Sequence, residues 1–146
     1  MQRSTAKTVR GGLAAVFLGV ALLAAGPASA AEPTIAVGEI SPPTELDAAD
    51  VRASAEREIL TLDAEQLKGK GKLVVALALV RSTVNNAVRF TVNAMVRDAK
   101  TGNMLAIIEG GAHAEGALST SLARQVADAA VRNAISRIPT ALLARR

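Results

Sequence analysis

The sequence contains no cysteine, tryptophan or tyrosine, and its 146 residues include only two phenylalanines and one histidine. Without cysteine, the chain can form neither disulfide bonds nor thiolate metal sites. Without tryptophan or tyrosine, it lacks the side chains on which sugars and single-stranded bases most often stack. Its stability must therefore come from an apolar core, which a chain of this length is able to form.

Acidic side chains are absent from the first 30 residues, which carry three basic side chains and an apolar run from Leu13 to Ala25. A Gly-Pro pair ends the run, and an Ala-Ser-Ala sequence follows at residues 28–30. This pattern is typical of a secretory signal peptide, whereas a bilayer-spanning helix needs about 20 apolar residues. We predict cleavage after Ala30, which leaves residues 31–146 as a single α/β domain, soluble and periplasmic or secreted. A retained membrane anchor is the alternative.

The basic character of the chain comes mostly from this leader. The whole chain has 17 basic and 13 acidic side chains, and removal of the leader leaves 14 basic and 13 acidic ones. Nucleic-acid binding needs a surplus of cations that face phosphate groups. The sequence therefore predicts no nucleic-acid partner.

The first elements after the leader are a strand and an amphipathic helix. We expect a strand over residues 34–40, ended by Ser41-Pro42-Pro43, and a helix that begins after Asp47 as its N-cap. One face of this helix carries Val51, Ala55, Ile59 and Leu62. The opposite face carries Arg52, Glu56, Arg57 and Asp63, a composition typical of a solvated surface.

Three strands are expected next. Residues 73–80 are eight consecutive apolar residues, which predicts a central strand buried on both faces. After a loop at residues 81–87, apolar and polar residues alternate over 88–97, as in a half-buried strand. The turn at residues 98–103, in which Gly102 or Asn103 supplies a positive φ, leads into an antiparallel strand from Met104 to Glu115.

Small side chains dominate one face of that last strand and one face of the helix that follows it. The strand face comprises Ala106, Ile108, Gly110, Ala112 and Ala114, and the helix face comprises Ala123, Val126, Ala127, Ala130, Val131, Ala134 and Ile138. We expect the helix to be capped by Ser119, Thr120 or Ser121 and to end near Ile138, because Pro139 disfavours helical geometry before it. Small residues on both partners predict close packing.

The order strand-helix-strand-strand-strand-helix predicts an α+β fold. The expected architecture is a two-layer α/β sandwich, with two helices on one face of a mainly antiparallel four-stranded sheet. This order, with the hairpin sequence from Asp98 to Leu105 before an Ala/Gly-rich strand and a helix, resembles bacterial envelope domains of the curli-secretion and penicillin-binding-protein-activator lipoprotein type. It is more loosely similar to lipopolysaccharide-assembly and transporter-auxiliary lipoproteins. The resemblance implies an assembly or adaptor role, although this chain lacks the acylated cysteine of those families.

The catalytic candidates are few. His113 lies between Glu109 and Glu115 on the outward side of its strand, where a histidine beside a carboxylate can orient a general base or bind a metal. One histidine with two carboxylates is a poor zinc-ligand set, and hydroxyls before an amphipathic helix are typical caps. We therefore predict a solvent-facing surface, with no catalytic residue, metal or cofactor.

Two surfaces remain as interaction candidates. The first is the outward side of the sheet, and its residues are Arg89, Thr91, Asn93, Arg97, His113 and Glu115. Its expected partner is an envelope protein of unknown identity. The second comprises Lys68, Lys70 and Lys72, whose segment precedes a strand and so is not a phosphate-binding loop. It is either a solvated turn or a weak contact with an anionic membrane surface.

These observations predict an exported, non-catalytic adaptor or assembly module that acts through protein-protein contacts. The alternative is a periplasmic carrier of a small apolar or lipid ligand between sheet and helices, and an enzyme is the third class. The sequence does not specify the oligomeric state.

Overall fold

The protein is described by a computed structural model over residues 34–144, so the predicted cleavage site lies outside the described residues. The elements in chain order are β1 (Ile35–Ser41), α2 (Ala48–Ile59), the 3-10 helix η2 (Ala64–Leu67), β2 (Leu73–Val84), β3 (Ala87–Asp98), β4 (Met104–Glu115), α3 (Thr120–Ile135) and α4 (Ile138–Leu143).

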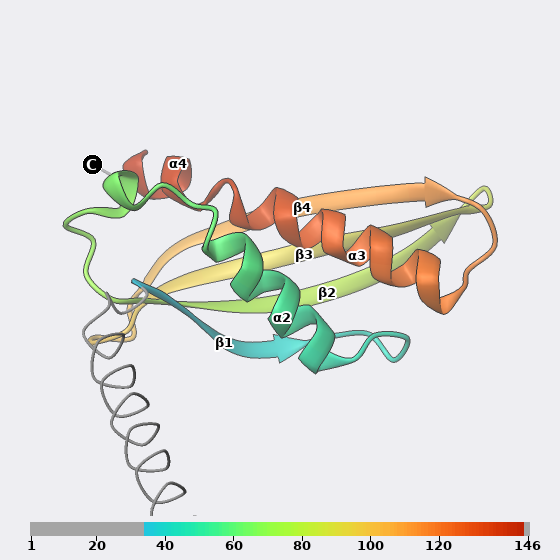
Figure 1. Ribbon diagram of the computed structural model, residues 1–146, viewed down its shortest axis with the longest axis horizontal. Helices are drawn as coiled ribbons and strands as arrows, with labels where there is room; N and C mark the ends of the chain where they lie inside the picture. Colours follow the sequence, from blue (N-terminus) through green and yellow to red (C-terminus); the bar gives the residue numbers. More distant parts are fainter. Residues whose placement is uncertain (1–33, 145–146) are drawn as a thin grey trace, which may run out of the picture. The chain divides into compact units, whose positions relative to one another are not determined.

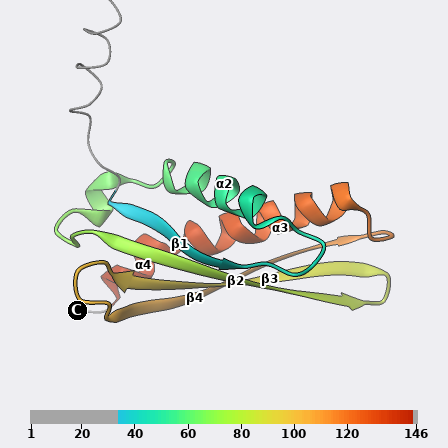
Figure 2. The ribbon, with the colours of Figure 1, turned by 90° about the horizontal axis from the view of Figure 1, so that it is seen from below.

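The four strands form one mixed sheet in the order β1-β2-β3-β4. β1 pairs with β2 in parallel, because α2 carries the chain back between them, while the β2-β3 and β3-β4 pairs are antiparallel. Helices α2 and α3 lie over one face of this sheet (Figure 1). The side view in Figure 2 shows the two layers, with helices on one side and an uncovered sheet face on the other. The predicted two-layer α+β architecture is confirmed.

The connection between β2 and β3 differs from the expected loop at residues 81–87. β2 continues to Val84, and only Asn85 and Asn86 link it to β3, with φ angles of 49° and 65°. Two consecutive positive φ angles are the signature of a two-residue hairpin turn, and asparagine tolerates them better than other non-glycine residues. The loop prediction was wrong, since the hairpin extends four residues further than the apolar run.

The prediction that β2 is buried on both faces was also wrong. Leu73, Val75, Leu77 and Leu79 are buried under the helices, whereas the alternate residues Val74, Ala76 and Ala78 are only half-buried on the uncovered face. Both helices pack on the same side of the sheet, so the run has one fully buried face.

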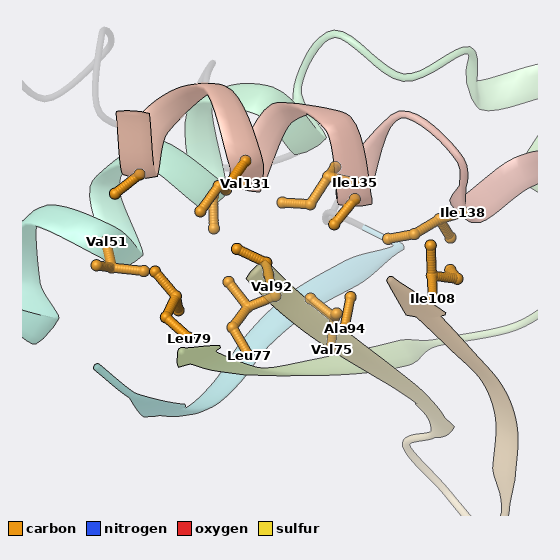
Figure 3. Packing of buried hydrophobic residues seen from close by; sticks show 14 of the residues in the cluster. Val51, Val75, Leu77, Leu79, Val92, Ala94, Ile108, Val131, Ile135 and Ile138 are labelled. Atoms are coloured by element: carbon orange, nitrogen blue, oxygen red, sulfur yellow. The ribbon is translucent and has the colours of Figure 1, made fainter. Parts of the chain in front are cut away.

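The core lies between helices α2 and α3 and the covered face of the sheet. Phe90 is fully buried, and Figure 3 shows Val92, Ala94 and Ile108 of the sheet opposite Val131 and Ile135 of α3. A Cβ atom at Gly110 would lie only 2.7 Å from the Cα of Ala134, closer than such atoms can approach. The predicted close packing between the small-residue faces is therefore confirmed.

The helix ends follow local sequence signals. The Asp47 carboxylate accepts a hydrogen bond from the Ala49 N–H at 2.8 Å, and the Ser119 hydroxyl accepts one from the Leu122 N–H at 3.1 Å. Both N-caps agree with the prediction. α3 ends at Ile135 rather than near Ile138, and Pro139 instead lies in the first turn of α4, where its missing N–H has no cost.

Candidate functional site

The uncovered face of the sheet brings the predicted interaction residues together. Val88 and Phe90 of β3 are buried under the helices, so their neighbour Arg89 lies on the uncovered face. The register places Arg89 opposite His113 of β4 and opposite Ser82 of β2. The uncovered face also carries Thr91, Asn93 and Arg97 at alternate positions of β3, and Glu115 of β4, which is paired with Ala87. The sequence-predicted surface is therefore one continuous surface.

A shallow hollow lies at the end of this face nearest the Asn85-Asn86 turn. It has a volume of about 290 Å³ and is lined by Ser82, Val84, Ala87, Arg89 and His113. The guanidinium, imidazole and hydroxyl groups around it offer hydrogen bonds, and Val84 is an exposed apolar side chain beside them. This arrangement suits a single polar side chain of a partner better than a buried substrate.

A row of apolar side chains crosses the uncovered face near its other end. Ala76, Met95 and Ile107 form one row across β2, β3 and β4, and Ile107 is 65% exposed. The adjacent row contains Val74 and Arg97. The alternating pattern of β3 placed Met95 outward without indicating a role for it, and the sequence pattern did not reveal the exposed Ile107 as part of the surface. Exposed apolar and polar side chains are therefore mixed along this face, since Arg97 lies beside the Ile107 row and Val80 and Val84 are exposed toward the other end.

The catalytic candidates do not form a charge pair across the sheet. His113 lies opposite Arg89, and Glu109 lies opposite Asn93. Within residues 34–144, no group of three or more His, Cys, Asp or Glu side chains is placed to hold a metal ion. The Ser119 hydroxyl serves as the cap of α3.

One carboxylate has a perturbed pKa for a structural reason. The Asp98 side chain accepts hydrogen bonds from the backbone N–H groups of Thr101 and Lys100, at 3.0 and 2.8 Å. These bonds stabilise the charged form and hold the pKa of Asp98 below its ordinary value of 3.8. The carboxylate thus fixes the turn between β3 and β4, in which Gly102 supplies the predicted positive φ of 76°.

The predicted lysine segment is an exposed loop between η2 and β2. Lys68 lies 3.9 Å from the Glu65 carboxylate, with both side chains about 80% exposed, so this ion pair is weak. The loop reaches the β3-β4 turn, because the Lys72 carbonyl accepts a hydrogen bond from the Ala99 N–H at 2.9 Å. Contact with an anionic surface remains a prediction for Lys68, Lys70 and Lys72.

Side chains also donate hydrogen bonds to backbone carbonyl groups of both edge strands, β1 and β4. Arg52 was expected on a solvated helix face, but its guanidinium donates to the Val37 and Gly38 carbonyls of β1 at 2.8 and 2.7 Å. An irregularity in the β1-β2 register between Val37 and Ile40 accompanies this contact. The prediction for Arg52 was wrong because the helix pattern cannot reveal a partner on a distant strand.

The other edge strand, β4, accepts similar hydrogen bonds from side chains at and just after the end of α3. The Asn133 amide donates to the Gly111 carbonyl at 2.8 Å, and the Arg137 guanidinium donates to the Glu109 carbonyl at 3.0 Å. A strand edge whose carbonyls are occupied is a poor template for another strand. Addition of another strand at these positions would have to displace those side chains.

Comparison with known proteins shows the fold and no family. No protein-family model matches the chain, and no curated protein matches it in sequence. Among solved structures, the hypothetical protein CT253 from Chlamydia trachomatis is similar with a TM-score of 0.55 and 14% identity, over 76% of this chain and 98% of that one. The PelC dodecamer from Paraburkholderia phytofirmans gives a TM-score of 0.51 and 16% identity, over 71% of this chain and 86% of that one.

A minor lipoprotein from Acinetobacter baumannii covers 75% of this chain and 92% of its own, with a TM-score of 0.45 and 14% identity. Likeness at such identities shows the fold alone, which is a four-stranded sheet with two helices on one face. The resemblance to curli-secretion and penicillin-binding-protein-activator domains stays a prediction. Within residues 34–144, no helix is both long enough and apolar enough to cross a membrane.

Proposed function

We propose that the chain is an exported, non-catalytic module of the bacterial envelope that acts through protein-protein contacts on the uncovered sheet face. The observation that carries this proposal is the composition of that face, where the exposed apolar side chains of Ile107 and Val84 lie among the polar side chains Arg89, Arg97 and His113. Polar groups beside exposed apolar side chains are what a protein partner can bury and hydrogen-bond at once.

The chemistry of the face points to an acidic, partly apolar partner. The guanidinium groups of Arg89 and Arg97 can each hold a carboxylate through two parallel hydrogen bonds. The edge contacts made by Arg52, Asn133 and Arg137 support the face as the contact surface, since strand addition at those positions would have to displace them.

The alternative of a ligand carrier has less support. A cavity for an apolar ligand would have to lie between the layers, where Gly110 and Ala134 leave no room for a single methyl group. A shallow apolar groove of about 330 Å³ does lie beside β1, but it is lined by Glu56 as well as Ile35, Val37, Ile59 and Leu60. It is an outer groove rather than an interior ligand site.

Charge reversal on the uncovered face tests the proposal. The double variant Arg89→Glu with Arg97→Glu should keep the fold, because both side chains are exposed, and should lose co-purification of its partner from envelope extracts. The matched control is Arg124→Glu with Arg132→Glu, two exposed residues of α3 on the other layer. Partner capture retained by the first variant would reject this surface.

Two further measurements accompany this test. His113→Ala should have little effect, and a specific activity that disappears with His113 would move the protein into the enzyme class. Intact-mass analysis of the exported protein should begin at Ala31 if the leader is cleaved as predicted. Recovery of the full-length chain in membranes would instead favour a retained anchor.

A further inference from the structure

Lysine and arginine are segregated in this domain. After the leader, the sequence contains only four lysines, Lys68, Lys70, Lys72 and Lys100, and uses arginine everywhere else. Several arginines have structural partners within the domain, and these are Arg52, Arg81, Arg124, Arg132 and Arg137. The four lysines all lie in two loops, the segment before β2 and the turn after β3, and Lys68 forms an ion pair with Glu65. We call the end of the domain that holds these loops the lysine end.

The two loops are neighbours in space. The sheet register places Leu73, at the start of β2, opposite Asp98, at the end of β3. The Lys72 carbonyl accepts a hydrogen bond from the Ala99 N–H, which joins the loops directly. Figures 1 and 2 show the β3-β4 turn and the loop before β2 at the same end of the sheet. The four lysines therefore surround one end of the domain.

Exposed apolar side chains occur at the same end. Leu60, at the end of α2, is 81% exposed and borders the groove beside the start of β1. Leu143 is 39% exposed in α4, which lies at this end in Figure 1. Met104, the first residue of β4, is also 39% exposed. Lysines around exposed leucine and methionine side chains are a combination found where proteins rest on a lipid surface, because the long lysine stems lie along apolar groups while their ammonium groups stay in water.

Two of the carboxylates at this end are engaged with the backbone, whereas Glu56 lines the groove beside β1. Asp63 accepts a hydrogen bond from the Glu65 N–H at 3.0 Å, and Asp98 accepts those of Lys100 and Thr101. The Glu65 carboxylate makes the long contact with Lys68. These carboxylates order their loops, and they offset part of the local positive charge without covering the lysine side chains.

We propose that the lysine end is a docking surface for an anionic phospholipid bilayer. The chain enters the described domain at this end, because the Thr34 carbonyl accepts a hydrogen bond from the Leu73 N–H at 2.7 Å. The lysine end adjoins Arg97, which pairs with Met104, whereas the uncovered-face residues Arg89 and His113 lie near the opposite ends of the strands. It goes beyond the proposed function and does not depend on it.

Vesicle binding tests this surface. The N-terminus of the exported protein is first determined by intact-mass analysis. The protein is then sedimented with vesicles of equal phosphatidylcholine and phosphatidylglycerol, and with vesicles of phosphatidylcholine alone. Binding should require phosphatidylglycerol and weaken as salt is raised. Each lysine near an anionic membrane contributes about fivefold in affinity, so Lys68→Glu with Lys70→Glu and Lys100→Glu should lower it by about a hundredfold or more.

The control changes the net charge equally on other parts of the domain. Arg89→Glu with Arg124→Glu and Arg132→Glu should retain binding to within a few-fold, and melting curves establish that both triple variants are folded. Leu60→Ser should lower affinity several-fold and leave the melting temperature unchanged, because the side chain is exposed. An equal loss in the two triple variants, or equal binding to both vesicle types, would overturn the proposal. Because the control variant includes Arg89, it can lose partner capture and still bind vesicles, which separates this inference from the proposed function.

Discussion

The two faces of the sheet are built from the same strands and have opposite properties. On the helix-covered face, Val92 and Ala94 pack against α3 and Gly110 meets the backbone of Ala134. On the uncovered face, at the alternate positions of the same strands, Arg89 and Gly111 meet solvent. Because side chains alternate along a strand, the residues that pack the core and the residues open to a partner lie on opposite faces of the same strands. A substitution on one face therefore leaves the packing on the other face unchanged.

Neighbouring glycines provide the largest expected contrast. Gly110→Val should destabilise the domain by at least about 3 kcal/mol or prevent folding, because its Cβ would overlap the backbone of Ala134. Gly111→Val should change stability by less than about 1 kcal/mol, since a Cβ there would have its nearest neighbour, the Phe90 carbonyl oxygen, at an ordinary 3.5 Å. Urea unfolding of the two variants measures the difference. Similar losses at both positions would contradict the two-layer arrangement.

A smaller contrast compares the two sides of α3. Ala130 is fully buried, so Ala130→Leu should overpack its contact and destabilise by about 1 to 3 kcal/mol. Arg124→Ala should cost no more than about 0.5 kcal/mol, because the ion pair with Asp50 is largely exposed. Thermal melts that rank these variants the other way would mean that the helix is rotated about its axis.

The smallest expected effect is a pH dependence at the β3-β4 turn. The folded-state pKa of Asp98 is lowered, so its contribution to stability is present above the ordinary value of 3.8 and is lost as the pH falls through the lower folded value. Asp98→Asn should therefore be slightly less stable than the wild type at neutral pH. The difference in stability between the two proteins should vanish in acid. Melting curves recorded at decreasing pH measure it. A difference that grows in acid would contradict this role of the carboxylate.

The sequence predicted the covered face better than the uncovered one. Small residues such as Gly110 and Ala134 recur at strand and helix spacing, so their close approach is visible as a pattern. The hairpin turn was missed because Asn85-Asn86 lacks the glycine of the strongest hairpin signals. The double burial expected for β2 was wrong because apolar residues alone do not tell on which side the helices lie.

The surface residues show the same limit. Arg89 and His113 were placed on one surface because alternation fixes the side of a strand on which a residue lies. The contact between Arg52 and the β1 carbonyls joins residues 15 positions apart at a register irregularity, which no local pattern records. Ile107 was overlooked because an outward apolar residue in a strand looks like a core residue until the register is known.

Photocrosslinking from single positions tests the central claim, that the uncovered sheet face is the contact surface, most directly. A photoreactive residue at Thr91, in the middle of that face, is compared in cells with one at Gln125, which is exposed on α3. The account predicts a discrete partner adduct from position 91 and none from position 125. An adduct formed only from position 125 would contradict it and place the contact on the helical layer.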